Sequence, residues 1–176
     1  MTSSRNHRAR GFTLIEAALA TVIVGVGVLA SVELFAGLTT HTRDAEHRTT
    51  ALFLANNIHE LLGELSFDDP VTGSATFGPE ANETLDAATA GTTAYNDLDD
   101  FNQSFNPPID SARNRLSQLA QYTQVVSVVS VDPNKPTLSA SGTDCRRILV
   151  SILYRASESE PSVEVHRLSW LLTRRQ

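Results

Sequence analysis

The amino-acid sequence predicts an α+β protein in which one long N-terminal α-helix packs against a small antiparallel β-sheet. Three observations support this prediction: an apolar run near the N-terminus, leucines at helical spacing beyond it, and Val- and Ile-rich runs in the last third of the chain. The chain has 176 residues, which is long enough for one domain with a hydrophobic core. Its single cysteine excludes an intrachain disulfide.

The apolar run follows a basic leader. Three arginines and no acidic residue occupy positions 1–11, and the 16 residues from Ala17 to Val32 carry no charge. A helix from Phe12 to Glu33 would be about 32 Å long, close to the ~30 Å thickness of the hydrocarbon core of a bilayer. The sequence therefore predicts a membrane-spanning helix over residues 12–38, with the arginine-rich leader on the cytoplasmic side.

One carboxylate, Glu16, stands at the head of this apolar run. A charge within hydrocarbon costs roughly 2.5–3.5 kcal/mol even on lenient insertion scales. Such a group is tolerated when a cation compensates it. Glu16 is therefore a candidate functional residue, whereas Glu33 falls at the far membrane interface, where a charge costs little.

A specific resemblance begins where the leader meets the run, in the stretch Gly11-Phe12-Thr13-Leu14-Ile15-Glu16. It is similar to the processing motif of the type IV pilin and type II secretion pseudopilin superfamily. The resemblance implies that a prepilin peptidase and methyltransferase cuts between Gly11 and Phe12 and methylates the new Phe12 amine. It also implies that Glu16 pairs with the Phe12 amine of a neighbouring subunit during filament assembly.

The resemblance further implies a structural role, as a minor pilin or pseudopilin of a type IV pilus or a type II secretion filament. Its partners would be the peptidase, other pilin-like subunits and, before assembly, inner-membrane lipid. The chain would cross the inner membrane once, with its N-terminus in the cytoplasm and its C-terminal domain in the periplasm. Many relatives have proline at the position of Glu33, and this difference favours a minor subunit.

A second hypothesis is an unprocessed, single-span membrane protein whose extracytoplasmic domain binds a ligand or partner. Retention of residues 1–11 in the mature protein would favour it. Nucleic acid is not an expected partner under either hypothesis, because phosphate binding requires a basic face. The whole chain has a net charge of −6, and loss of the leader would leave 11 basic and 20 acidic residues.

Residues 39–66 are predicted to continue the helix as an amphipathic segment. The spacing of its apolar residues is helical, as shown by Leu54, Ile58, Leu61 and Leu65. Pro70 disfavours helix at its own position and before it, so the helix should end near Leu65. The three histidines of this helix lack the spacing of a metal-binding pair and are expected to be solvated.

Residues 67–121 are predicted to form a variable loop region, because glycines and prolines interrupt it and apolar periodicity is absent. Its acidic residues include Asp97, Asp99 and Asp100, which form a weak candidate calcium site, since hard cations prefer oxygen ligands. Some pseudopilins hold calcium in this part of the chain. The alternative is a solvated acidic loop without a cofactor, attached to the head by Tyr95, Phe101 and Phe105. Residues 111–121 could contain a short helix.

Residues 122–176 are predicted to form the antiparallel sheet, from three runs at Tyr122–Val131, Arg146–Arg155 and Pro161–Leu172. Alternation places Leu168 and Trp170 on one face of the last run, and Val165 on the other.

The chain shows no common catalytic motif, and no enzymatic activity is predicted. Cys145 could face His166 across two strands, but no sequence pattern supports a catalytic pair.

Overall fold

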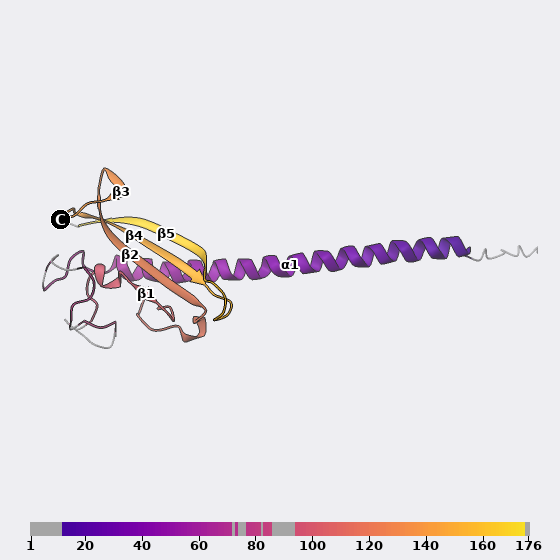
Figure 1. The fold of residues 1–176 in the computed structure, drawn as a ribbon, viewed down its shortest axis with the longest axis horizontal. Coiled ribbons are helices and arrows are strands. Elements are labelled where there is room, and N and C mark those ends of the chain that lie inside the picture. The colour runs from indigo at the N-terminus through magenta and orange to yellow at the C-terminus, as the bar shows by residue number, and fades with distance from the viewer. Residues whose placement is uncertain (1–11, 72, 74–76, 82, 86–93, 175–176) are drawn as a thin grey trace, which may run out of the picture. The chain divides into compact units, whose positions relative to one another are not determined.

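The computed structural model describes residues 12–71, 73, 77–81, 83–85 and 94–174, and these confirm the predicted α+β architecture. The chain has two compact units, which divide between Ala45 and Glu46. The first unit contains the N-terminal part of helix α1, which spans Leu14–Gly63. The second contains the remainder of α1, the loop region and a five-stranded sheet (Figure 1).

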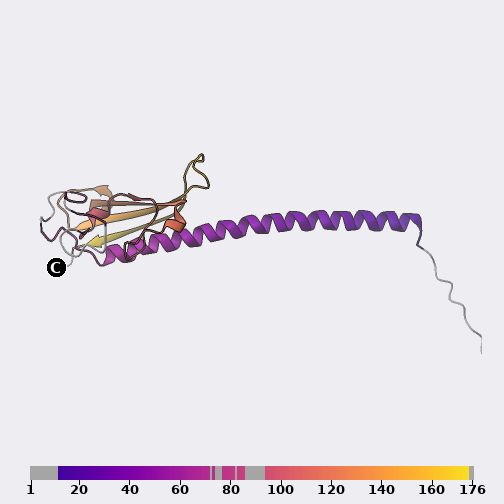
Figure 2. The same cartoon turned by 90° about the horizontal axis from the view of Figure 1, so that it is seen from below.

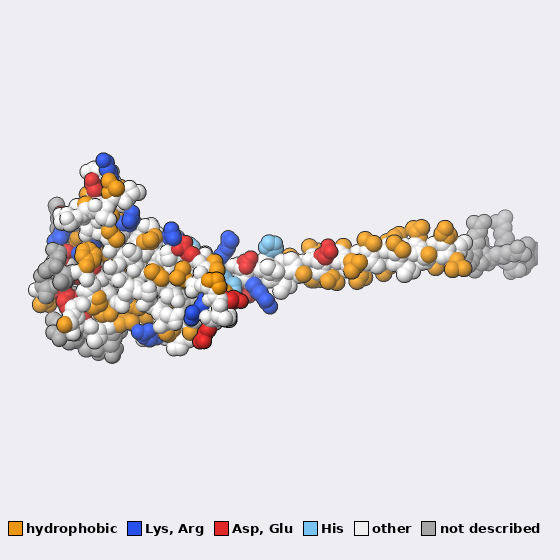
Figure 3. Space-filling model, in the orientation of Figure 1, with side chains coloured by type: hydrophobic (Ala, Val, Ile, Leu, Met, Phe, Trp, Pro, Cys, Tyr) orange, Lys and Arg blue, Asp and Glu red, His pale blue; other side chains and the backbone are white. Residues whose placement is uncertain are grey.

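In the first unit, apolar side chains surround α1 and are exposed (Figure 3). The helix is long and apolar enough to cross a membrane. Its hydroxyl groups bond within the helix: Thr21 donates to the Ala17 carbonyl at 2.8 Å, and Ser31 donates to the Gly27 carbonyl at 2.8 Å. Because lipid offers no hydrogen-bond partners, this internal bonding makes these polar side chains compatible with a hydrocarbon environment.

The sheet of the second unit is antiparallel, with strand order β1-β2-β4-β5 and with β3 paired to β2. Figures 1 and 2 show the C-terminal part of α1 along one face of this sheet. The three predicted strands are confirmed, whereas the two short ones were not predicted. The strand bounds are β1 Ser104–Phe105, β2 Tyr122–Asp132, β3 Lys135–Ser139, β4 Cys145–Tyr154 and β5 Val163–Thr173.

The core lies between α1 and the sheet. The helix contributes the predicted Leu54, Ile58 and Leu61, all buried, while Leu65 lies beyond the helix end and is half-buried. Burial of one such side chain stabilises a fold by about 1.5–3 kcal/mol, so this stripe is a major part of the stability of the second unit. From the sheet, the buried apolar residues include Val126, Val128, Ile148, Val150 and Ile152.

A β-bulge in β5 corrects one prediction. Ile152 pairs with His166 and Leu153 with Glu164, so Val165 is an extra residue between two pairs. An extra residue shifts the alternation of side chains along the strand. Val165 consequently packs against the core together with Leu168, although strict alternation placed it on the opposite face.

The loop region is more structured than its sequence suggests. Phe101 and Phe105 are buried in the core, and Tyr95 meets the Phe101 ring edge-on at a centroid distance of 5.3 Å. The prediction that these aromatics attach the loop to the head is confirmed. The short helix expected over residues 111–121 is reduced to a single 3₁₀ turn, Ser117–Leu119.

Two histidines of α1 contact aromatic residues; the expectation of solvated histidines is wrong for His47, whereas His59 is exposed. His47 is half-buried, and its Nδ1 lies 2.6 Å from the hydroxyl of Tyr122. The ring of His59 lies 4.7 Å from that of Trp170, which packs on the core as predicted.

Gln124 links three parts of the core, and its replacement by leucine is expected to destabilise the fold. Its fully buried amide accepts from the Ile109 N–H at 2.7 Å and donates to the carbonyls of Ile109 and Leu54 at 2.9 and 3.0 Å. The variant leaves the Ile109 peptide groups without this partner. We expect a loss of about 2–4 kcal/mol in the free energy of unfolding, measured by denaturant titration of the full chain in detergent. The exposed Gln121→Leu is the control, and equal stability of the two variants would contradict this role.

Candidate functional site

The first turn of α1 holds the predicted assembly residue, Glu16. The backbone N–H and the hydroxyl of Thr13 donate to its carboxylate at 3.1 and 3.0 Å. In return the Glu16 N–H donates to the Thr13 hydroxyl at 3.4 Å. This reciprocal arrangement is a capping box, which satisfies backbone donors left over at a helix N-terminus. Gly11 lies outside the described residues.

Thr13 is a site residue that the sequence interpretation missed, although the Thr-x-x-Glu spacing is itself a capping signal. The capping box orients the Glu16 carboxylate toward the start of the helix, on the side of Phe12. The positive end of the helix dipole also favours a carboxylate there. Around it the apolar side chains are highly exposed, with Phe12 at 82% and Leu14 at 92%. This end of the molecule therefore combines one oriented carboxylate with an uncovered apolar surface.

The possible pairing of Cys145 with His166 does not occur. Cys145 pairs with Thr173 across the sheet, and His166 pairs with Ile152. Cys145 and Ile152 are seven positions apart on β4, a separation of roughly 20 Å along a strand. The thiol and the imidazole consequently cannot act on one substrate atom.

Each of the three aspartates that the sequence suggested as calcium ligands accepts hydrogen bonds from other protein groups. Asp97 Oδ1 accepts the backbone N–H groups of Asp99 and Asp100 at 3.0 and 3.2 Å. Asp99 accepts from the Gly78 N–H at 3.1 Å and from Arg146 at 2.6 Å. Asp100 Oδ2 accepts from the N–H groups of Asn96 and Asp97. All three are buried, so the expectation of a solvated acidic loop is wrong for this part.

Arg146 of β4 connects the loop region to the sheet. Its guanidinium bonds Asp99 at 2.6 Å and Asp68 at 3.1 Å, and it lies over the ring of Phe67 at 4.5 Å. Arg174 extends the network, at 2.6 Å from Asp68. Ion pairs away from water stabilise only when several groups compensate the charges. Here two carboxylates bond the terminal nitrogens of Arg146, while its Nε is buried without a hydrogen-bond partner among the described residues.

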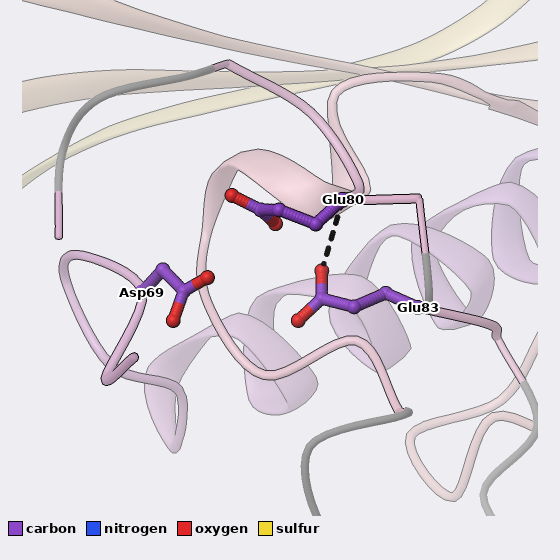
Figure 4. A group of neighbouring side chains, drawn as sticks. All are labelled: Asp69, Glu80 and Glu83. Atoms are coloured by element: carbon purple, nitrogen blue, oxygen red, sulfur yellow. Dashed lines mark hydrogen bonds between the residues drawn. The ribbon is translucent and has the colours of Figure 1, made fainter. Parts of the chain in front are cut away.

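A second group of carboxylates forms around Asp69, Glu80 and Glu83, whose oxygens lie within 4.8 Å of one another. Figure 4 shows Asp69 on one loop and the two glutamates on another, with their carboxylates directed toward a shared space. The Glu80 N–H donates to Glu83 at 3.2 Å. The Asn96 amide donates to the other oxygen of Glu83 at 2.5 Å.

These surroundings disfavour negative charge on several carboxyl groups. Burial, followed by the neighbouring carboxyls of Glu80 and Asp100, raises the pKa of Glu83 to about 8. Burial, together with Asp99 and Asp100, raises the pKa of Asp97 to about 7. Burial also raises the pKa of Asp100. The loop region thus concentrates carboxylates in a place where their charge is costly.

Comparison with known proteins gives one match, at the N-terminal end of the chain. The family model of the prokaryotic N-terminal methylation motif matches residues 6–32. The long helix packed on an antiparallel sheet is a pilin-like α+β architecture, and the motif match supports a similarity to the type IV pilin-like family. The motif is typical of structural proteins, and together with the apolar helix it indicates membrane anchoring. No curated protein and no solved structure matches the chain.

Proposed function

We propose that this chain is a minor pilin or pseudopilin, a structural subunit of a type IV pilus or a type II secretion filament. The match to the methylation motif over residues 6–32, which continues directly into helix α1, carries this proposal. Prepilin peptidase removes residues 1–11, and the amine of Phe12 is methylated. The mature subunit then starts at an apolar residue that is 82% exposed.

Assembly uses the two properties of the N-terminal end of α1. Its exposed apolar surface is covered by lipid before assembly and by the helices of other subunits in the filament. The transfer from membrane to filament therefore exposes little apolar surface to water. The Glu16 carboxylate pairs with the methylated amine of Phe12 on a neighbouring subunit. Because two charges in an apolar medium are tolerated only as a pair, this contact selects the correct axial position of the incoming helix.

The charge of the leader supports the proposed orientation. Arginines beside a membrane span favour the cytoplasmic side. The N-terminus therefore starts in the cytoplasm, where the peptidase acts, and the second unit lies in the periplasm. After assembly it is displayed on the filament.

The N-terminus of the mature protein tests the proposal. The full chain is expressed with a prepilin peptidase, and the purified product is analysed by mass spectrometry. The expected product begins at Phe12 and carries one methyl group on its amine. A product that retains residues 1–11 in the presence of active peptidase would support the unprocessed membrane-anchored alternative.

Glu16→Ala is expected to leave cleavage intact and to reduce incorporation into filaments by about tenfold or more, because the buried amine loses its partner. Incorporation is measured as the fraction of processed chain that co-purifies with sheared filaments. Glu33→Ala is the matched control, since Glu33 lies at the other end of the apolar run. Equal incorporation of the Glu16 variant and the wild type would refute the proposed pairing.

A further inference from the structure

The two borders of the sheet differ, because one is covered and the other is open. The border formed by β2 is covered by β1, by β3 and by loop groups, and the Val126 N–H donates to the Gln103 carbonyl at 2.9 Å. The Val128 N–H donates to Asn102 Oδ1 at 3.0 Å. At the opposite border, β5 pairs with β4 alone in the described part of the chain (Figure 1). An uncovered edge strand presents backbone groups to which another extended chain can bond.

The hydrogen-bond pattern identifies the backbone groups on the free edge of β5. The Arg174 N–H donates to the Asp144 carbonyl at 3.0 Å, so Arg174 faces β4. In an antiparallel pair, successive residues direct their N–H and C=O groups alternately toward the partner strand and away from it. The pairing with β4 is regular from His166 to Thr173. The groups directed away from β4 therefore belong to Arg167, Ser169, Leu171 and Thr173, whose side chains are also exposed.

This edge lacks the features that usually prevent strand association. Natural proteins protect edge strands with short length, proline or charged side chains. Strand β5 has 11 residues, whereas a typical strand has about 5–6, and it contains no proline. Its only charged residues, Glu164 and Arg167, pair with each other at 2.6 Å, and the stretch Leu168–Thr173 carries no charge. The C-terminal half of β5 is therefore open to an uncharged strand.

A cleft of about 660 Å³ adjoins the same half of β5. Trp170 and Leu172 of β5 line it on one side, and His59, Leu65 and Phe67 line it on the other. Trp170 and Leu172 pack against the core, so they lie on the face of the sheet that α1 covers. Because side chains alternate between the two faces of a sheet, every second side chain of a strand added to β5 would lie beside this cleft.

We propose that β5 binds an extended segment of another protein, which adds a strand to the sheet and places alternate apolar side chains in the cleft. A row of alternating N–H and C=O groups is complemented by another extended backbone. In such strand addition the main-chain bonds supply affinity, and the pockets beside the strand supply specificity. The segment is uncharged where it meets Leu168–Thr173, since a charge there would lose water without gaining a partner.

The direction of α1 disfavours a second copy of this chain as the occupant. His47 contacts Tyr154, which pairs with the first residue of β5, and His59 contacts Trp170, nearer the end of that strand. The C-terminal part of α1 therefore runs parallel to β5. Antiparallel pairing of two β5 strands would place the Glu46 ends of the two second units at opposite ends of the joined sheet. Two chains anchored in one membrane enter their second units from the same side, which favours a different protein.

Peptide binding to the full chain in detergent tests the proposal. The probes are synthetic acetylated hexapeptides in which Ser or Thr alternates with Leu, Val or Phe. The single tryptophan, Trp170, lines the cleft and reports binding by its fluorescence. We expect saturable binding by members of this set, and slower hydrogen exchange at the amides of Arg167, Ser169 and Leu171. The absence of both effects with every peptide would overturn the proposal.

Backbone N-methylation of a binding peptide separates strand addition from simple apolar contact. Two versions are made, each methylated at one of the two alternating sets of amides. The version that loses the donors facing β5 should bind at least about tenfold more weakly, and the other should retain its affinity. Equal binding of both versions and the unmethylated peptide would overturn the proposal, because the edge would then contribute no hydrogen bonds.

Leu171→Pro is expected to weaken peptide binding by about tenfold or more, because it removes an N–H that faces the free edge and leaves the bonds to β4 in place. Leu171→Ala keeps this N–H and is the matched control, which should bind nearly as the wild type does. Circular dichroism establishes that each variant is folded. Wild-type affinity in folded Leu171→Pro would refute the edge as the binding surface.

Sedimentation equilibrium of the wild type and Leu171→Pro tests the alternative occupant. We expect the same oligomeric state for both proteins. A wild-type dimer that Leu171→Pro abolishes would assign the edge to a second copy and overturn the choice of partner. The contact involves neither Phe12 nor Glu16, so these results are independent of the proposed filament role.

Discussion

A chain in which Gly11 is replaced by valine is expected to remain almost entirely unprocessed. Glycine carries no side chain, so its backbone can approach another surface closely and adopt conformations that valine resists. A peptide bond that is to be cut must lie close to the catalytic groups of the peptidase, so a bulky side chain next to it hinders cleavage. Intact-mass measurement after co-expression with the peptidase would show a product that retains residues 1–11 and whose Phe12 is not methylated.

Two substitutions show whether the effect is local to the cleavage position. Gly37→Val changes a helical glycine whose added Cβ would meet no atom within 4 Å, and this variant should be processed normally. Gly11→Ala adds only a methyl group and should be processed more than the valine variant. Normal cleavage of Gly11→Val would contradict the assignment of Gly11 as the processing residue and would weaken the proposed filament role.

The parts of this fold that could be predicted from sequence are those with short-range periodicity. Helix α1 repeats its apolar residues every three or four positions, and β2, β4 and β5 alternate at period two. Each signal arises within one segment, independent of its partners. The start of α1 was also recognisable, because the apolar run, the basic leader and Glu16 lie within a few turns of each other.

The features that could not be predicted from the sequence depend on contacts between segments that are distant in the chain. Strand β3 contains Pro136 and resembles a turn, yet it pairs at its ends with β2, at an edge where proline is tolerated. The bulge at Val165 follows from the register between β4 and β5, which neither strand specifies alone. The same limitation applies to the group of carboxylates formed by Asp69, Glu80 and Glu83, because these residues approach one another only after the loop has folded.

The buried ion-pair network also depends on contacts between segments that are distant in the sequence. It attaches the loop region to the sheet. Asp68 lies at the start of the loop region and Asp99 lies near its middle, and Arg146 of β4 bonds both. Arg146 thus holds two segments of the loop region to β4, and its loss would leave the Asp99 carboxylate buried without its ion pair.

Arg146→Met is expected to destabilise the second unit strongly. Methionine retains much of the apolar stem, but Asp99, whose side chain is 3% exposed, loses its ion pair. Breaking one side of such a pair typically costs about 3–5 kcal/mol, because the remaining charge is buried without compensation. Denaturant unfolding of the full chain in detergent, followed by the fluorescence of the single tryptophan, measures the loss.

Arg167→Met provides the contrast, because Arg167 forms an exposed pair with Glu164 at 2.6 Å and its side chain is 60% exposed. Exposed pairs contribute about 0–1 kcal/mol, so this variant should unfold close to the wild type. The double variant Arg146→Met with Asp99→Asn removes the uncompensated charge and should regain part of the lost stability. If Arg146→Met and Arg167→Met cost the same, the buried network does not hold the loop to the sheet.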